Sequence, residues 1–188
     1  MTRIIAGTAG GRRVETPKGE LTRPTTDRVR EALFSGLDAR DVVRGARVLD
    51  LFAGSGALGL EAASRGAADV VLVDSAREAT MVARRNATAL ELARVTVVLS
   101  SVQRYLAGRP AAPVRLVLLD PPYSFSEQDL TAVLDALVGG GWLDQGAVVV
   151  VERSGRSPEP RWPAGLARES VRRYGDTTLW LAGPPRAQ

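Results

Sequence analysis

The stretch Val48-Leu49-Asp50-Leu51-Phe52-Ala53-Gly54-Ser55-Gly56-Ala57-Leu58-Gly59 passes from an apolar strand through a glycine-rich turn into a helix. Glycine is needed where a backbone turns tightly or approaches a ligand closely, because a Cβ atom there would clash. This order of strand, turn and helix predicts the first unit of a doubly wound α/β domain with a nucleotide-type site. The predicted cofactor contacts around the turn are Asp50, Phe52, Ala53, Gly54, Ser55 and Gly56.

A second carboxylate follows the next apolar segment. Asp74 lies twenty positions beyond Gly54, directly after the segment Asp69 to Val73. At that place in such a fold, a carboxylate can accept hydrogen bonds from both hydroxyls of a bound ribose. The glycine turn and Asp74 therefore support each other as parts of one cofactor site.

Asp50 distinguishes between two cofactors that share this geometry. A pyrophosphate favours a loop without negative charge at the helix N-terminus, and Asp50 just before the turn would repel it. The same carboxylate could pair, directly or through water, with the amino group of a methionine moiety. This charge argument favours S-adenosylmethionine over a dinucleotide.

Further apolar segments repeat the pattern of the first strand, mostly without alternation of apolar and polar residues. Strands of that kind are buried on both faces, as in a parallel sheet, and here helices separate them. Two later segments joined by Gly175-Asp176 have the spacing of a hairpin. The predicted strands are Arg47–Leu51, Asp69–Val73, Val95–Leu99, Arg115–Leu119, Ala147–Val151, Leu166–Tyr174 and Thr177–Leu181. We expect an α/β, Rossmann-like fold with a mostly parallel seven-stranded sheet, helices on both faces and an antiparallel C-terminal strand.

Three helices carry entry signals. Ser75 with Glu78, and Ser126 with Asp129, have the spacing of a capping box. The segment Arg23 to Leu37 opens with Pro-Thr-Thr-Asp and continues with apolar residues at helical spacing.

The opening residues predict a small basic β-hairpin. Its strands are Arg3 to Ala6 and Arg12 to Val14, on either side of a glycine-rich turn. We divide the chain into this extension at residues 1–22, one α/β domain at 23–182 and a disordered tail at 183–188.

Composition narrows the possible chemistry. The 188 residues include no cysteine and no histidine, which excludes disulfides, thiolate nucleophiles, imidazole bases and the usual zinc ligands, so we expect no metal. The net charge of +4 comes almost entirely from arginine and suits a polyanionic partner, although arginine can also replace lysine through genomic base composition. No apolar run is long enough for a membrane span or a secretory signal, so we expect a cytoplasmic protein without a membrane partner.

The fourth strand ends in Leu118-Leu119-Asp120-Pro121-Pro122-Tyr123, at the sheet edge where ligands of open α/β folds bind. Two prolines stiffen this loop and leave the Pro121 carbonyl able to accept a hydrogen bond, and Asp120 supplies a second acceptor. Two fixed acceptors can hold both hydrogens of an exocyclic base amine and point its lone pair at a sulfonium methyl group. Tyr123 could stack on a base removed from its helix. The predicted catalytic residues are Asp120, Pro121, Pro122 and Tyr123.

The third strand ends in Ser100-Ser101, where many enzymes of this kind place an aspartate that holds the adenine amine. A serine hydroxyl accepts a hydrogen bond more weakly than a carboxylate does. Ser101 is the predicted adenine contact.

These residues resemble the class I methyltransferases with an Asp-Pro-Pro-Tyr signature, and within them the bacterial small-subunit ribosomal RNA guanine-N2 methyltransferases called RsmD. The resemblance covers nearly the whole chain, and its most specific parts are the opening hairpin and residues 22–34. The motifs that carry it are Arg3-Ile4-Ile5-Ala6-Gly7, Thr22-Arg23-Pro24-Thr25-Thr26-Asp27-Arg28-Val29-Arg30-Glu31-Ala32-Leu33-Phe34, the loop Asp50 to Gly56, and Asp120 to Tyr123.

The resemblance implies a class I methyltransferase fold and an S-adenosylmethionine-dependent enzyme that methylates the N2 amine of a specific guanine in 16S rRNA. It also implies that the segment Arg23 to Thr26 closes over the methionine end of the cofactor, with Arg23, Thr25 and Thr26 as contacts. The basic hairpin would then hold RNA. The predicted RNA-binding residues are Arg3, Arg12, Arg13, Arg28 and Arg30.

Other functions stay open on the residues alone. A nicotinamide-dependent reductase would explain the glycine turn and Asp74 but not the charge of Asp50, and a non-catalytic RNA-binding protein would explain only the arginines. N6-adenine methylation of DNA or RNA asks for the same two acceptors, and only the resemblance favours guanine. Carbon-5 pyrimidine methylation is disfavoured because it commonly uses a cysteine. We expect a monomer that acts on 16S rRNA within an assembled or assembling small ribosomal subunit.

Overall fold

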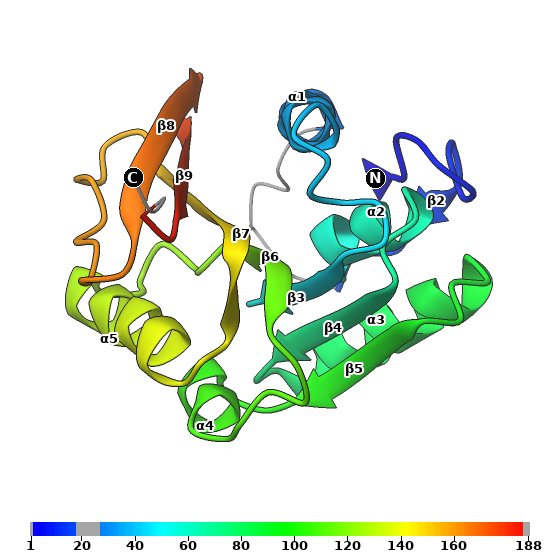
Figure 1. Ribbon diagram of the computed structural model, residues 1–188. Helices are drawn as coiled ribbons and strands as arrows, with labels where there is room; N and C mark the ends of the chain where they lie inside the picture. Colours follow the sequence, from blue (N-terminus) through cyan, green and yellow to red (C-terminus); the bar gives the residue numbers. More distant parts are fainter. Residues whose placement is uncertain (1, 18–26, 186–188) are drawn as a thin grey trace.

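A seven-stranded sheet forms the centre of the computed structural model, which describes residues 2–17 and 27–185 (Figure 1). Its strand order is β5-β4-β3-β6-β7-β9-β8. The strands are β3 (Arg47–Leu51), β4 (Asp69–Asp74), β5 (Val95–Leu99), β6 (Val114–Leu119), β7 (Leu143–Ser154), β8 (Ala167–Tyr174) and β9 (Thr177–Gly183). The first five pair in parallel, and β9 lies antiparallel between β7 and β8. The predicted fold class is confirmed.

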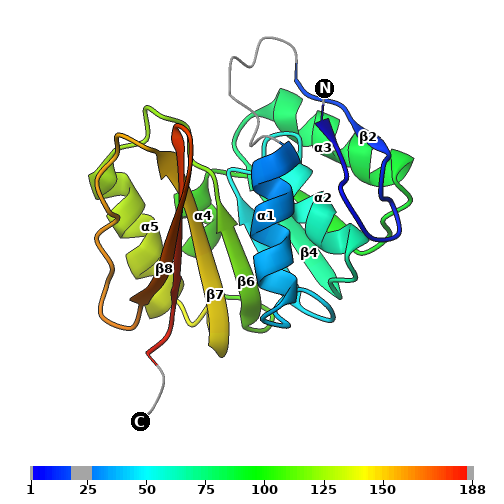
Figure 2. The same ribbon diagram turned by 90° about the horizontal axis from the view of Figure 1, so that it is seen from above.

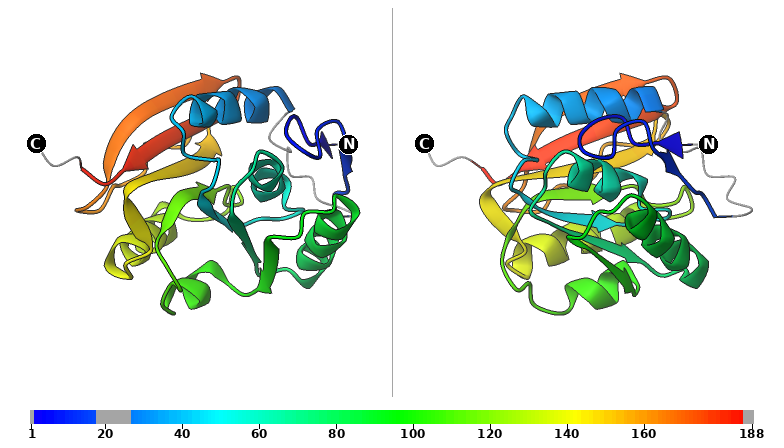
Figure 3. Two further views of the ribbon diagram at one scale, coloured as in Figure 1. Left: turned by 45° about the vertical axis from the view of Figure 1, so that its right-hand side comes forward. Right: turned by 90° about the vertical axis from the view of Figure 1, so that its right-hand side faces the viewer.

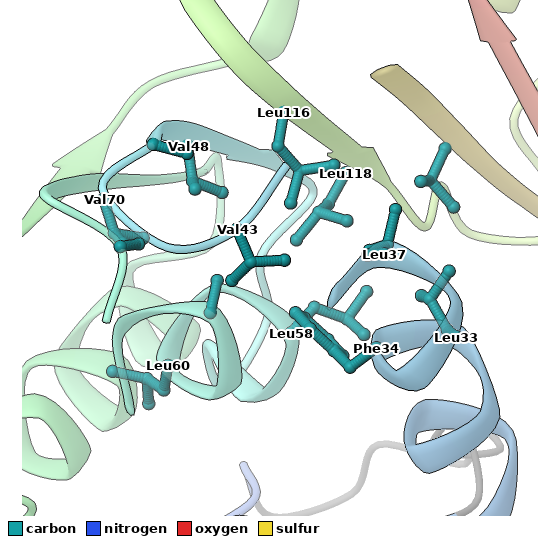
Figure 4. Close-up of a cluster of buried hydrophobic side chains, with 14 of the residues drawn as sticks. Leu33, Phe34, Leu37, Val43, Val48, Leu58, Leu60, Val70, Leu116 and Leu118 are labelled. Atoms are coloured by element: carbon teal, nitrogen blue, oxygen red, sulfur yellow. The ribbon is translucent and has the colours of Figure 1, made fainter. Parts of the chain in front are cut away.

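Helices cover both faces of this sheet. They are α1 (Asp27–Asp38), α2 (Ala57–Ser64), α3 (Arg77–Ala89), α4 (Val102–Leu106) and α5 (Glu127–Gly139). Side chains of α1, α2 and α3 pack on one face of the sheet, where Leu33, Phe34 and Leu58 meet Leu116 and Leu118 (Figure 4). The other face packs against α4 and α5. None of the helices within the described ranges is long and apolar enough to cross a bilayer.

The two predicted capping boxes have different outcomes. Ser126 caps α5, because its Oγ accepts the Asp129 amide at 3.0 Å and donates to the Asp129 carboxylate at 2.6 Å. The prediction for Ser75 is wrong, since α3 begins one residue later with Ala76 at the cap position and no side-chain cap. Asp74 takes the Ala76 amide instead, at 2.8 Å.

The N-terminal hairpin is shorter than predicted, with β1 at Thr2–Arg3 and β2 at Arg13–Val14. It packs against α2 and α3 (Figure 2). Glu61 of α2 is fully buried and accepts the amides of Ile5 and Ala6 at 2.7 and 3.1 Å. The backbone approaches α2 so closely that a Cβ atom on Gly7 would lie 1.9 Å from the Ser64 carbonyl oxygen. The hairpin is therefore docked on the domain and is not a free arm.

The position of the site follows from the strand order. β3 and β6 are neighbours, but the chain between them visits β4 and β5 on the far side of β3. In open α/β sheets, ligands bind at the carboxyl ends of the strands where the order reverses in this way. The glycine turn follows β3 and the Asp-Pro-Pro-Tyr loop follows β6, so both lie at this point.

The Glu61 carboxylate gives a test of how firmly the hairpin is held. It also accepts Arg65 Nε at 2.6 Å and lies 3.9 Å from the buried Arg30 Nε. In Glu61→Gln an amide hydrogen would face backbone donors and the charge opposite Arg30 would be lost. We expect the free energy of unfolding to fall by about 3 kcal/mol, as when other buried pairs are broken. Urea unfolding measures this change.

Glu91→Gln is the matched control, because Glu91 is largely exposed and pairs with Arg12 at the surface. It should unfold at nearly the wild-type urea concentration. Hydrogen exchange adds a local readout, since the Ile5 and Ala6 amides should lose protection only in Glu61→Gln. An unchanged urea midpoint for Glu61→Gln would contradict the role of Glu61 as the anchor.

Candidate active site

The turn after β3 has the conformation that its glycines predicted. Phe52, Gly54 and Gly56 all have positive φ, at 64°, 55° and 84°. A Cβ atom on Gly56 would lie 2.8 Å from Leu72 Cδ1. A phenylalanine whose backbone is in the left-handed region is uncommon, and such strained residues are concentrated at functional sites.

Asp74 is tied to this turn. Its Oδ2 accepts the Gly54 amide and its Oδ1 accepts the Ala76 amide, both at 2.8 Å. Each oxygen keeps a further lone pair, so the carboxylate is fixed in place and can still accept hydroxyl donors. This arrangement suits the predicted contact with a ribose.

Asp50 is a buried carboxylate with one oxygen unpartnered. Its Oδ2 accepts the Gly59 amide at 2.8 Å, whereas its Oδ1 has no hydrogen-bond partner within the described part of the chain. Burial raises the pKa of Asp50 to about 7; the nearby Asp74 charge adds to the rise, and the Gly59 hydrogen bond opposes it. Because the pKa of Asp50 is higher in the folded protein than in the unfolded chain, its contribution to the free energy of unfolding is largest at low pH. That contribution is lost as the pH rises from about 4 to about 7. A cationic group beside Oδ1 would relieve this cost, which fits the amino group of a methionine moiety.

The Asp-Pro-Pro-Tyr loop lies directly beside the glycine turn. Leu51 of β3 pairs with Leu119 of β6, so Phe52 and Asp120 are the first residues beyond the ends of these neighbouring strands. The Phe125 amide donates to the Pro122 carbonyl at 2.8 Å and closes the loop as a turn. Tyr123 is 63% exposed, which leaves its ring able to meet a base from solution.

Phe125 and Arg153 hold the Asp-Pro-Pro-Tyr loop in place, and sequence reasoning missed both. The rings of Phe52 and Phe125 meet edge to face with centroids 4.8 Å apart. Arg153, buried at the end of β7, donates to the Phe125 carbonyl at 3.1 Å and pairs with Glu127. An available signal was the charged pair Glu152-Arg153 directly after four valines of a buried strand.

Asn86 was also missed, and it joins the glycine turn to the N-terminal segment. Its Nδ2 donates to the Ser55 carbonyl at 2.9 Å and to the Glu15 carbonyl at 3.0 Å. Its Oδ1 accepts the Glu15 amide at 2.9 Å. The sequence signal that could have found it is a polar residue at helical spacing from Val82 and Ala83, on the face of α3 that is otherwise mostly apolar.

The predicted adenine contact has a structural role of its own. Ser101 is the N-cap of α4 and its Oγ accepts the Arg104 amide at 3.3 Å. It lies at the same edge as Asp74, because the Ser100 amide donates to the Asp74 carbonyl at 2.9 Å. Arg23, Thr25 and Thr26 lie outside the described residues.

The predicted RNA-binding arginines separate into two groups. The assignment of Arg30 is wrong, because this side chain is 1% exposed and is held by Asp27, Glu61 and the Arg3 carbonyl. Arg12 donates to the carbonyls of Ala89 and Leu90 at the end of α3, so its guanidinium is largely engaged. Residues Arg3, Arg13 and Arg28 are exposed.

Comparison with known proteins agrees with this geometry. A family model described as Conserved hypothetical protein 95 matches residues 2–183. The Escherichia coli protein named Ribosomal RNA small subunit methyltransferase D is 40% identical over 171 residues, which cover 90% of this chain and 84% of that protein. YlbH of Bacillus subtilis, provisionally assigned as an rRNA methyltransferase, is 35% identical over 93% of this chain and 95% of its own.

A solved structure agrees as well. The Escherichia coli protein yhhF, provisionally assigned as a methyltransferase, superposes with a TM-score of 0.86 at 37% identity and covers 97% of both chains. The chain therefore belongs to the Conserved hypothetical protein 95 family, the RsmD family, and is a methyltransferase.

Proposed function

We propose that this protein transfers a methyl group from S-adenosylmethionine to the N2 amine of a guanine in 16S rRNA. The observation that carries the proposal is the meeting of two loops at the neighbouring ends of β3 and β6. Asp50 in β3 and Asp74 at the end of β4, which binds the Gly54 amide of the first loop, are the carboxylates for a cofactor. The second loop carries Asp120 and the Pro121 carbonyl as acceptors for a base amine. A relative named for methylation of small-subunit ribosomal RNA, at 40% identity, supports the choice of substrate.

In this mechanism each group has a separate task. Asp74 accepts the ribose hydroxyls and Asp50 pairs with the amino group of the methionine moiety, which together fix the position of the sulfonium methyl. Asp120 and the Pro121 carbonyl would accept the two amine hydrogens and direct the nitrogen lone pair toward that methyl. As the N–C bond forms, the S–C bond breaks, S-adenosylhomocysteine leaves, and the amine gives up one proton to Asp120 or to water. Tyr123 stacks on the guanine. We place the substrate within an assembled or assembling small ribosomal subunit and the enzyme in the cytoplasm as a monomer.

Transfer of labelled methyl tests the proposal. Small ribosomal subunits from cells that lack this protein are incubated with labelled S-adenosylmethionine and digested to nucleosides. N2-methylguanosine in 16S rRNA is the expected product. Label in N6-methyladenosine would replace guanine by adenine as the target, and tight binding of a dinucleotide without transfer would overturn the proposal.

Asp120→Ala should abolish transfer while cofactor binding survives. The substitution removes one fixed acceptor at the reacting amine, and loss of a comparable preorganised group lowers kcat by roughly 100- to 1000-fold. The measurement is single-turnover methylation of small subunits, with S-adenosylhomocysteine affinity as the check on the cofactor site. Full activity of Asp120→Ala would refute the assignment.

Cofactor affinity should depend on pH through Asp50. Because its pKa is raised to about 7, the ionised form that pairs with a cationic amino group is the minor form below that pH. We expect the Kd of S-adenosylhomocysteine to fall by up to about tenfold per pH unit between 5 and 7 and then to level off. Calorimetry in buffers of different ionisation enthalpy should detect proton release at pH 6.

Asp50→Asn is the control for this pH dependence, because the amide keeps the size of the side chain and does not titrate. Its affinity should be weaker and nearly constant over the same range. A wild-type Kd that does not change between pH 5 and 7 would argue against contact between Asp50 and the amino group.

Arg153 should act as a positioning residue for the base-binding loop. Arg153→Met removes the donor to the Phe125 carbonyl and leaves Glu127 unpaired, so the loop that carries Tyr123 should shift. A displacement of about 1 Å can cost roughly 100-fold in rate, and we expect kcat to fall by about that factor with unchanged cofactor affinity. Steady-state kinetics on small subunits measures the split between kcat and KM.

Arg168→Met is the matched control, since Arg168 forms an exposed pair with Glu159 at 2.7 Å and does not contact the loop. It should keep the wild-type kcat. Equal effects of the two substitutions would show that Arg153 acts only through general stability.

A further inference from the structure

The arginines near β7 and β8 differ in whether they are engaged. Arg168 pairs with Glu159, Arg153 with Glu127, and the Arg172 guanidinium lies within 3.1 Å of the position of a Cβ atom on Gly36 of α1. Figure 3 shows α1 running beside β8. Arg156 and Arg173, by contrast, are exposed and have no ion pair or side-chain hydrogen bond within the described ranges. Their guanidinium groups are therefore not neutralised by a carboxylate within the described residues.

Strand register brings these two arginines to one corner of the sheet. Arg153, Thr178 and Arg173 are direct partners across β7, β9 and β8, so their side chains share one face of the sheet. Two strand spacings separate Arg173 from Arg153, or about 10 Å. The Gly155 amide donates to the Asp176 carbonyl at 2.7 Å, which ties the segment that carries Arg156 to the β8–β9 turn.

This corner lies on the base side of the site. β7 runs parallel to β6, so its carboxyl end is at the same edge as Asp120 and Tyr123. Arg153 provides the direct link, because it contacts the loop that follows Tyr123 and begins the row that ends in Arg173. The N-terminal hairpin lies instead against α2 and α3, beside the half of the sheet that carries Asp74.

We propose that Arg156 and Arg173 form a binding surface for the RNA backbone that flanks the target base. The inference rests on the proposed function and extends it to the path of the substrate, which crosses the ends of β7, β9 and β8. Exposed guanidinium groups beside the Asp-Pro-Pro-Tyr loop complement the charge of phosphates, and such contacts position a nucleic acid without reading its sequence. The segment that carries Arg156 and the end of β8 thus take the role that the sequence assigned to Arg12 and Arg30.

The test compares two double variants with the same change in charge. Arg156→Gln/Arg173→Gln removes the proposed surface. The control Arg44→Gln/Arg94→Gln removes two exposed arginines that precede β3 and β5, at the opposite edge of the sheet. Filter binding to protein-free 16S rRNA and to small ribosomal subunits, at several salt concentrations, gives affinity without any need for turnover. Methylation kinetics then gives kcat and KM.

We expect Arg156→Gln/Arg173→Gln to weaken binding to both RNA and particles by roughly tenfold, with unchanged kcat and cofactor affinity. The slope of log affinity against log salt should become shallower by about one to two, as for two lost phosphate contacts. The control should behave as wild type. Equal behaviour of the two double variants would overturn the proposal, as would a loss confined to particles, which would identify a ribosomal protein as the partner.

Failure of this inference and failure of the proposed function are distinguishable. Wild-type protein that binds RNA through these arginines but transfers no methyl group to 16S rRNA would refute the function and keep the surface. Wild-type protein that forms N2-methylguanosine, with no loss in Arg156→Gln/Arg173→Gln, would keep the function and refute the surface.

Discussion

The parallel pairing of β3 with β6 is the constraint on which the site depends. Leu51 and Leu119 are direct partners, so the two loops that leave these strands must start side by side. The chain between them places β4 and β5 on the far side of β3, so the strand order reverses between β3 and β6, where ligands of open α/β sheets bind. The edge contact of Phe52 with Phe125 then sets the spacing of the loops.

Patterns with local causes could be predicted from the sequence. β3 and β5 have the predicted bounds, because continuous apolar runs between turn residues have few other conformations in a sheet covered by helices on both faces. The helix cap at Ser126 could also be predicted, because its hydrogen-bond partner, Asp129, is only three residues away. The prediction for Ser75 failed because α3 begins one residue later, at Arg77, and the Ala76 amide binds the Asp74 carboxylate. β7 extends beyond its predicted end because Glu152, Arg153 and Ser154 pair with β9 across the sheet, which the run of valines does not reveal.

Whether an arginine is buried, paired or exposed could not be predicted, because this depends on carboxylates and carbonyls far away in the sequence. Arg30 and Glu61 are buried together, and burial lowers the pKa of Arg30. Arg12 binds the end of α3, and Arg153 binds the Phe125 carbonyl just after the Asp-Pro-Pro-Tyr loop. A net charge of +4 is therefore a poor guide to which cations face a partner. The place of Asp50 in the strand before the glycine turn could be predicted, because it depends only on residues next to it in the sequence.

The docking of the N-terminal segment has a consequence for the order in which the protein assembles during translation. The Ile5 amide cannot form its hydrogen bond until Glu61 has been synthesised, 56 residues later. Glu15 likewise requires Asn86, which is synthesised 71 residues later. At ordinary rates of synthesis the second interval is roughly 4 to 14 seconds, during which Glu15 has no partner because Asn86 has not been made. The opening of the chain is thus synthesised first but cannot complete its packing until α3 has been made, and a fusion tag placed there would be brought close to α2 and α3 when this segment docks.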